Sequence, residues 1–258
     1  MFIKINKKFF KVKKNYLFWH KFSKNKWEPL NLKIYKYLIK KNTNYYDIGS
    51  WIGPTVLIAA SFYPKEIYAF EPDIKAYKEL KNNIFLNKNK LNKVKIELYN
   101  KAAHLFNGKT ILNIPHGNYG ASTSSLIKNV NTNYESVVIN SLNLLSFMNK
   151  KKLKSDDFIK IDIEGGEYKL LPCIGPILRK RKPNIYLAPH PFLIDGYFNK
   201  IFMTNKLLFS LRGYKYIYQI KKNALTSCRM INFLLKYRLP IFKKVSRTLV
   251  FTNKKLLN

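Results

Sequence analysis

The sequence predicts an α/β protein with a mostly parallel sheet that is covered by helices on both faces. From residue 44 onward, short and almost continuous apolar runs alternate with segments of helical periodicity. Such runs are typical of parallel strands buried on both sides, and their alternation with helices is typical of a doubly wound fold. Three of the runs end in glycines or acidic residues, at the edge where such sheets bind ligands. The 258 residues suffice for one large domain.

The N-terminal segment differs from the rest in composition. Residues 1–42 are basic and aromatic, and they end in the helical run 30–40. We therefore expect an N-terminal arm and helix that cover one edge of the sheet, followed by a single domain over 43–258. The last part of that domain, residues 200–258, is again basic.

The next segment contains three strands and two helices. β-Branched and aromatic residues mark the strands. Pro54 suits the first turn of a helix, and Asp73 suits the position that caps the next one. In chain order, we expect a strand at 44–48, a helix at 55–62, a strand at 66–70, a helix at 74–87 and a strand at 94–98.

The second half is less regular at its start. The turn signal Asn107-Gly108 predicts a hairpin that ends near residue 114, and 115–135 resembles a polar loop with Gly117, Gly120 and a serine-rich stretch. Strands and helices then alternate again, with Gly213 as a helix stop. In chain order, we expect strand 137–140, helix 142–148, strand 157–161, helix 166–171, strand 184–188, helix 206–212, and strands 214–220 and 248–252.

The charge of the chain is strongly positive. Lys and Arg number 48 against 14 Asp and Glu, which gives a net charge of +34, and 42 of the basic residues are Lys. Three interpretations stay open: a composition that has drifted toward Lys and Asn, attraction to an anionic substrate or membrane surface, and nucleic-acid binding. The low Arg content argues against specific nucleic-acid recognition.

Targeting and redox signals are weak. The N-terminus lacks the apolar core of a signal peptide, so we expect a cytoplasmic protein. The most apolar C-terminal piece, 230–242, is interrupted by charges and Pro240, which favours a packed helix over a membrane-surface helix. Two cysteines cannot build a disulfide framework and suit a reducing compartment.

The first chemical motif is the turn after the first strand. Asp47 begins it, and Gly49 and Gly53 allow a tight turn that a ligand can approach closely. The turn lacks the Gly-Lys-Ser/Thr end of a nucleotide-triphosphate loop and the three glycines of the dinucleotide fingerprint. Both of those functions are therefore disfavoured.

The second motif is acidic and ends the next strand. Glu71 follows Gly49 by 22 positions. That separation is close to the spacing at which an acidic residue accepts hydrogen bonds from ribose hydroxyls. A carboxylate has the acceptor oxygens that a cis-diol needs. The alternative is a charge that merely favours the following helix N-terminus.

The third motif places three carboxylates within six positions. Asp162, Glu164 and Glu167 follow the strand 157–161 directly. Asp162 and Glu164 are separated by one residue and can point to the same side of an extended segment. That geometry suits a general base, a hydroxyl acceptor or a divalent-cation site. Glu167 fits best as a helix N-terminal charge.

Together these motifs resemble the FkbM-type methyltransferases. The resemblance runs from about residue 44 to 190 and includes Asp-Ile-Gly-x-x-Ile-Gly, Ala-Phe-Glu-Pro-Asp, an Asn-Lys-Ala segment, an Asn-Gly turn, and Ile-Lys-Ile-Asp-Ile-Glu-Gly-Gly-Glu. Membership implies a class I S-adenosylmethionine-dependent enzyme, in many cases an O-methyltransferase of sugars or natural products. It also implies a Rossmann-like, doubly wound, seven-stranded sheet whose last strand is antiparallel.

The resemblance also assigns roles to individual residues. Asp47, Gly49 and Gly53 would border the methionine part of the cofactor, and Glu71 would hold its ribose. Asp162 would lie near the sulfonium and the acceptor.

Other positions match the family less closely. Ala102 would lie near the adenine, although Lys101 stands where relatives have an acidic residue. His190 is the remaining part of a Glu-x-His pattern and a candidate general base. Ser50-Trp51 replaces the common Ala-Asn, so a bulky ring is expected beside the cofactor turn.

We therefore expect O-methylation of a sugar, a glycan or a related small acceptor, with Asp162, Glu164 and His190 as catalytic residues and S-adenosylmethionine as cofactor. Asp162 and Glu164 are also the candidate ligands of a divalent metal. The high charge suggests an anionic or lipid-linked acceptor and peripheral contact with an anionic membrane. The alternatives are an RNA methyltransferase and a catalytically degenerate binding protein. No motif specifies the acceptor or the oligomeric state.

Overall fold

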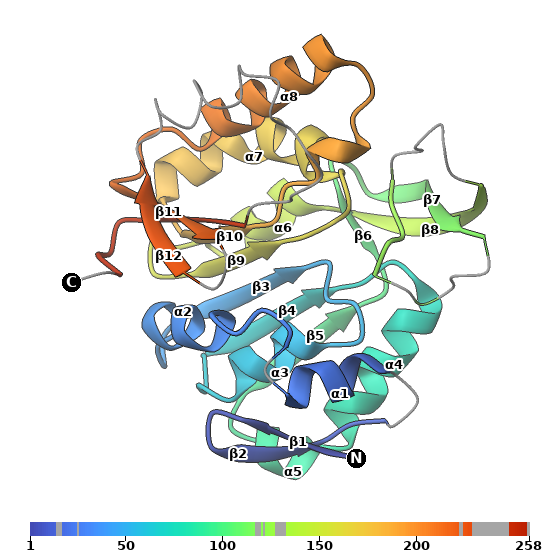
Figure 1. The fold of residues 1–258 in the computed structure, drawn as a ribbon, viewed down its shortest axis with the longest axis vertical. Coiled ribbons are helices and arrows are strands. Elements are labelled where there is room, and N and C mark those ends of the chain that lie inside the picture. The colour runs from blue at the N-terminus through green and yellow to red at the C-terminus, as the bar shows by residue number, and fades with distance from the viewer. Residues whose placement is uncertain are drawn as a thin grey trace.

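The computed structural model describes residues 1–13, 17–24, 26–116, 120, 122–126, 133–221, 224–228 and 248–256. A large sheet runs through the middle of the molecule, with helices above and below it (Figure 1). The α/β class and the helices on both faces, both expected from the sequence, are confirmed.

The large sheet has eight strands in the order β12-β11-β13-β10-β9-β3-β4-β5. Neighbours from β10 to β5 are parallel, whereas β13 is antiparallel to both β10 and β11. The strands are β3 (Asn44–Ile48), β4 (Glu66–Phe70), β5 (Lys95–Tyr99), β9 (Phe158–Ile161), β10 (Asn184–Leu187), β11 (Tyr216–Lys221), β12 (Ala224–Cys228) and β13 (Leu249–Thr252).

The expected number of seven strands is one too few. Seven strands, from β11 to β5, form the expected sheet, and its last strand in the chain, β13, is antiparallel as expected. The eighth strand, β12, extends the edge by pairing with β11 as a hairpin. Its sequence, Ala-Leu-Thr-Ser-Cys, carries little strand signal of its own. Pairing with a neighbour therefore decides its conformation.

Two helical layers bury the two faces of this sheet. One apolar cluster joins the sheet to α6 (Leu144–Lys150), α7 (Glu167–Arg181) and α8 (Tyr197–Ser210). The other joins it to α2 (Asn31–Leu38), α3 (Pro54–Ala60) and α4 (Ile74–Phe85). A short helix, α5 (Lys88–Leu91), follows α4, and a 3-10 turn (Pro191–Leu193) follows β10. Because each strand is buried on both sides, the apolar runs read from the sequence are nearly continuous.

Helix α7 extends well past its expected end. The expected end is residue 171. Pro172 and Pro176 come after it, and proline disfavours a helix interior. The helix nevertheless continues to Arg181. Its later turns bury Ile174, Ile177 and Leu178. This packing outweighs the local preference.

The N-terminal segment forms more than an arm and one helix. It contains the hairpin β1 (Phe2–Ile5) and β2 (Lys8–Lys11), then α1 (Leu17–Ser23) and α2. It also covers a face of the sheet, not an edge. The ring of Tyr35 in α2 packs at 5.5 Å from Tyr45 in β3 and at 5.0 Å from Phe158 in β9, and both of these strands are central.

The hairpin expected around Asn107-Gly108 is wrong. The strands on either side of that turn, β6 (Ala102–His104) and β7 (Gly108–Pro115), do not pair with each other. Both pair with β8 (Tyr134–Asn143), which lies between them in a separate three-stranded sheet. A turn signal does not reveal the partner of a strand when that partner comes later in the chain.

Some expectations lie outside the described residues, among them the helix over 230–242, Gly117 and about half of the loop 115–135. Within the described part of the chain, no helix combines the length and the apolarity needed to cross a bilayer. The boundary between residues 42 and 43 stays a prediction.

Candidate active site

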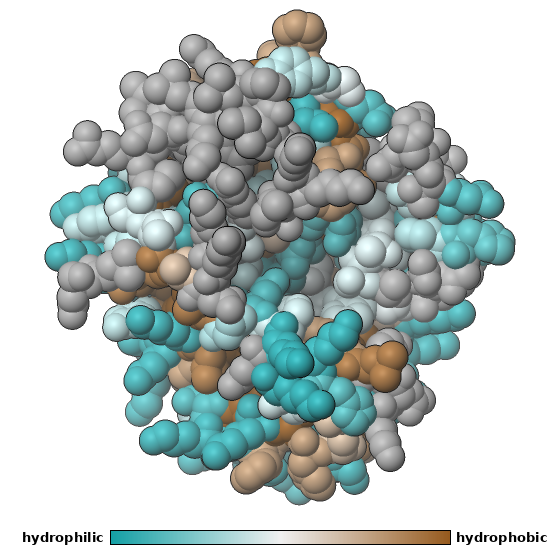
Figure 2. Space-filling view, viewed as in Figure 1, coloured by the Kyte–Doolittle hydropathy of each residue, from teal (hydrophilic) through white to brown (hydrophobic). Residues whose placement is uncertain are grey.

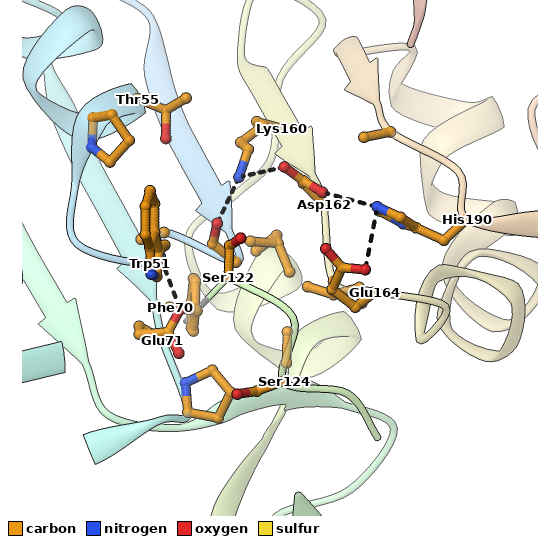
Figure 3. A pocket seen from close by; sticks show the side chains of 18 of the residues that line it. Trp51, Thr55, Phe70, Glu71, Ser122, Ser124, Lys160, Asp162, Glu164 and His190 are labelled. Carbon is orange, nitrogen blue, oxygen red and sulfur yellow. Dashed lines mark hydrogen bonds and ion pairs between the residues drawn. The ribbon is translucent and has the colours of Figure 1, made fainter. Parts of the chain in front are cut away.

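The carboxyl ends of four parallel strands open into one cavity of about 510 Å³. It is lined by residues that follow β3, β4, β9 and β10, by Ala102 and Ala103 of β6, and by the segment that contains α1 (Figure 3). Parallel strands bring their carboxyl ends to the same edge, so motifs more than a hundred positions apart meet there. Glu71 and Asp162 both line this cavity.

The two glycines of the first turn are required by the backbone of the protein itself. Gly49 has a φ of 85°, and a Cβ placed on it would lie 1.9 Å from the carbonyl oxygen of Asp162. Gly53 has a φ of 94°, a conformation that favours glycine, although its Cβ would meet only the end of the flexible Leu80 side chain. Gly49 lines the cavity, whereas Gly53 does not. Gly49 therefore allows two protein segments to approach closely, whereas the sequence assigned this close approach to a ligand.

Asp47 lies behind the cavity wall. Its carboxylate is fully buried and accepts a hydrogen bond from Thr55 Oγ1 at 2.6 Å. Lys160 Nζ lies 3.4 Å from Asp47 Oδ1 and 3.5 Å from Asp162 Oδ2, and it donates to the carbonyl of Gly49 at 2.5 Å. Burial raises the pKa of the Asp47 carboxyl, although the charge of Lys160 opposes this. Asp47 therefore does not line the cavity itself, but two of its partners, Thr55 and Lys160, do.

Glu71 projects its carboxylate at the end of β4. Oε2 accepts from the backbone N–H of Trp51, and Oε1 accepts from the backbone N–H of Asp73, each at 2.8 Å. Burial raises the pKa of Glu71 to about 7, although these two hydrogen bonds oppose the shift. Each carboxylate oxygen has a second lone pair, so Glu71 can still accept from the two hydroxyls of a diol.

Trp51 forms part of the cavity wall beside Glu71 (Figure 3). Its indole Nε1 donates to the carbonyl of Gly120 at 2.7 Å, and its ring packs edge-to-face on Phe18 of α1 at 4.7 Å. The bulky ring expected beside the cofactor turn therefore joins α1 and the Gly120 loop to that turn.

Three candidate catalytic residues meet on the opposite side of the cavity (Figure 3). His190 Nε2 lies 3.5 Å from Asp162 Oδ1 and 3.6 Å from Glu164 Oε2. One ligand atom from each of the three residues falls within 4.8 Å of the others, so the group has the donor set and the size to hold a divalent cation. Glu164 adopts the left-handed conformation, with a φ of 48°.

Glu167 orients His190, a role the sequence analysis missed. Its buried Oε1 accepts from the backbone N–H of His190 at 2.7 Å and lies 3.2 Å from Nδ1 of the ring. Burial by itself lowers the pKa of His190, but the hydrogen bond with Glu167 and the charges of Glu167, Glu164 and Asp162 raise it to about 9. Burial raises the pKa of Glu164 to about 7, although His190 opposes the shift.

Two further site residues escaped prediction. Lys160 had a sequence signal, since it is the one charged residue in the strand Phe-Ile-Lys-Ile and a buried lysine needs partners. Glu28 had none. It lines the cavity and accepts from Tyr186 OH at 3.0 Å, which lies 158 positions away.

Apolar side chains also contribute to the cavity wall. Phe70, Ala102, Ala103 and Leu112 line it, whereas Lys101 does not. The place of Ala102 near the adenine stays a prediction.

The cavity lining holds acidic and basic groups in nearly equal number, unlike the strongly basic chain as a whole. Four carboxylates line it, those of Glu28, Glu71, Asp162 and Glu164, against the ammonium groups of Lys21 and Lys160 and the imidazole of His190. S-adenosylmethionine carries a sulfonium and an ammonium group, a ribose diol and an adenine. The carboxylates of Asp162 and Glu164, the carboxylate of Glu71 and the apolar side chains of the lining match these groups in kind.

The sheet with its antiparallel β13, the glycine turn after β3 and the acidic residue after β4 are typical of class I S-adenosylmethionine-dependent methyltransferases. The sequence model of the FkbM methyltransferase domain matches residues 47–218. The chain therefore belongs to the FkbM methyltransferase family.

Solved structures give weaker likenesses. An FkbM methyltransferase from Methylobacillus flagellatus is 15% identical with a TM-score of 0.47 over 82% of this chain, and the chain spans only 44% of its length. A precorrin-6y C5,15-methyltransferase from Geobacter metallireducens is 12% identical with a TM-score of 0.41, and the match covers 94% of this chain and 95% of that chain. A putative rRNA-methylase from Clostridium thermocellum is 10% identical with a TM-score of 0.45, and the match covers 86% of this chain and 92% of that chain. No curated protein matches the chain in sequence.

Proposed function

We propose that the protein methylates a hydroxyl group of a sugar or a related polyol. The observation that carries this proposal is that Glu71 and the group formed by Asp162, Glu164 and His190 share one cavity with the glycine turn. One side of the cavity has the features of a nucleoside site, and the other has carboxylates that can accept a proton.

Separate residues bind the cofactor and position the acceptor. Glu71 accepts from the ribose hydroxyls, and the apolar wall with Ala102 receives the adenine. When bound, S-adenosylmethionine supplies an activated methyl group that leaves a positive sulfur. Asp162 faces the acceptor side and holds the hydroxyl in line for attack.

A hydroxyl needs a base because an alcohol is a weak nucleophile at neutral pH. Asp162 and Glu164 are the two carboxylates that face the acceptor side, and the pKa of Glu164, at about 7, lies where general-base catalysis works best. His190, with a pKa of about 9, is protonated at neutral pH in the free protein and holds both carboxylates in place. Its predicted role as base is thereby replaced in this proposal by a positioning role.

The charge of the cavity guides the choice of acceptor. An anionic acceptor, expected from the net charge, would meet the carboxylates of Asp162 and Glu164 next to the hydroxyl that is methylated. We therefore place a neutral hydroxyl-bearing ring in the cavity and confine any anionic group of the acceptor to the side of Lys21.

The test is methyl transfer from labelled S-adenosylmethionine to a panel of neutral and acidic sugars, with variants Asp162→Asn and Glu164→Gln. We expect transfer to neutral polyols and a loss in both variants, with cofactor affinity retained. Transfer only to acidic sugars would contradict the assignment of the acceptor. Full activity of both variants would contradict the proposed base.

A divalent cation is the second way to activate the hydroxyl, since the same three residues have suitable donor atoms. Activity that disappears with EDTA and returns with Mn²⁺ or Mg²⁺ would favour that route. Activity that EDTA leaves unchanged would favour the carboxylate base.

A further inference from the structure

The outer face of the N-terminal hairpin alternates phenylalanine and lysine. The register pairs Phe2 with Lys11 and Lys4 with Phe9. Successive residues of a strand point to opposite faces, so these four side chains share the outer face, while Ile3 between them is buried. Each phenylalanine thus lies opposite a lysine.

The neighbouring helices continue this pattern. Phe2 is 62% exposed, Phe9 56% and Phe85, at the end of α4, 62%. Lys90 Nζ lies 6.0 Å from the Phe2 ring, and Lys88 Nζ lies 5.0 Å from the Phe85 ring. We name this surface the hairpin patch: Phe2, Lys4, Phe9, Lys11, Phe85, Lys88 and Lys90. Figure 2 shows hydrophobic and hydrophilic residues interleaved at the end of the molecule where Figure 1 places β1, β2 and α5.

The hairpin is fixed to the body of the protein. Asn87 accepts from the backbone N–H of Lys11 at 2.8 Å and donates to its carbonyl at 2.7 Å. The inner residues Ile3 and Phe10 belong to the apolar core. The exposed rings therefore cannot turn inward without disrupting that core.

The lysines of the hairpin patch have no acidic partners within the described part of the chain. None of the four is in an ion pair there. The ion pair near the hairpin joins Lys13 to Glu79, so it does not neutralise the charge of any lysine in the patch. The patch therefore combines apolar rings with a local excess of positive charge.

We propose that the hairpin patch docks on an anionic lipid bilayer. Phenylalanine rings gain by leaving water for the acyl boundary, and lysine stems extend so that their ammonium groups reach anionic headgroups. Single-stranded RNA is the other anionic polymer that rings and lysines can bind. Residues 1–13 and 83–93, which form and flank the patch, contain no arginine, the basic side chain that nucleic-acid sites favour, and this favours the bilayer.

The test is co-sedimentation with vesicles of phosphatidylcholine alone and of phosphatidylcholine mixed with phosphatidylserine. Because a lysine near an anionic surface contributes about 1 kcal/mol, Lys4→Gln with Lys11→Gln should weaken binding to mixed vesicles about 30-fold. Phe2→Ser with Phe9→Ser should cause a comparable loss. High salt should abolish binding.

Two control pairs separate this patch from the general charge of the chain. Phe198→Ser with Phe202→Ser removes rings on α8 that are 83% and 63% exposed, at the opposite end of the molecule (Figure 1). Lys150→Gln with Lys154→Gln removes exposed lysines near α6. Both control pairs should keep nearly full vesicle binding.

Equal losses in the control pairs, equal binding to neutral vesicles, or binding of single-stranded RNA but not of vesicles would overturn the proposal. Circular dichroism checks that each variant is folded. The vesicles are tested without cofactor, so the result does not depend on the proposed function.

Discussion

The pKa of Glu71 predicts that affinity for S-adenosylmethionine depends on pH. Glu71 is 7% exposed, and burial raises its pKa to about 7 from an ordinary value of 4.5. A carboxylate accepts two ribose hydroxyls, whereas a protonated carboxyl offers fewer acceptor sites. The perturbation is a change of pH from 8 to 6, which protonates this group.

The size of the effect follows from that pKa. About nine-tenths of Glu71 is ionised at pH 8 and about one-tenth at pH 6, so affinity should fall about tenfold, or about 1.4 kcal/mol, across this range. Isothermal titration calorimetry at a series of pH values measures it. Glu71→Gln should bind weakly at every pH and lose the dependence.

Glu164 also has a pKa of about 7, so Glu164→Gln is the matched control. The dependence should persist in that variant. A pH profile of affinity that is flat in the unmodified protein, or a pH dependence that disappears in Glu164→Gln and stays in Glu71→Gln, would refute the reasoning.

The same pKa also predicts how Glu71 affects folding stability. The stability contribution of most acidic residues rises with pH, but that of Glu71 falls. Because folding raises the pKa of Glu71, its contribution to stability is present below pH 4.5 and is lost as the pH rises to about 7.

Four further predictions concern single positions. Asp162→Asn should lower methyl transfer about 100-fold while calorimetry shows unchanged cofactor affinity, and equal transfer would exclude it as base. Lys160→Met leaves the buried Asp47 without its cation and should cost about 3–5 kcal/mol in urea unfolding; a loss below about 1 kcal/mol would contradict this. Gly49→Ala should prevent stable folding. Gly213 also has a positive φ, but no atom lies within 4 Å of an added Cβ, so Gly213→Ala should lower the free energy of unfolding by only about 1 kcal/mol. Asp73→Ala removes a helix cap that accepts from Lys75 and Ala76 and also removes the acceptor of the buried Gly120 N–H, so thermal unfolding should show a loss of about 2–4 kcal/mol.

Local signals were sufficient for most elements. The strand 44–48 and the strand 66–70 have the bounds expected from their apolar runs, and Asp73 caps α4 as its side chain suggested. These features depend on residues that are neighbours in the chain. The wrong hairpin at Asn107-Gly108 and the early end of α7 arose where the decisive contacts come from elsewhere.

The sequence by itself indicated an α/β protein of the FkbM methyltransferase family, because the strands and the motifs that end them follow one another in a recognisable order along the chain. It also identified Glu71, Asp162, Glu164 and His190 as the residues of interest. Only the tertiary structure decided that these share one cavity and that Glu28, Lys160 and Glu167 belong with them. The physical reason is that the carboxyl ends of parallel strands converge at one edge, whereas the partners of a buried charge come from whichever segment packs against it.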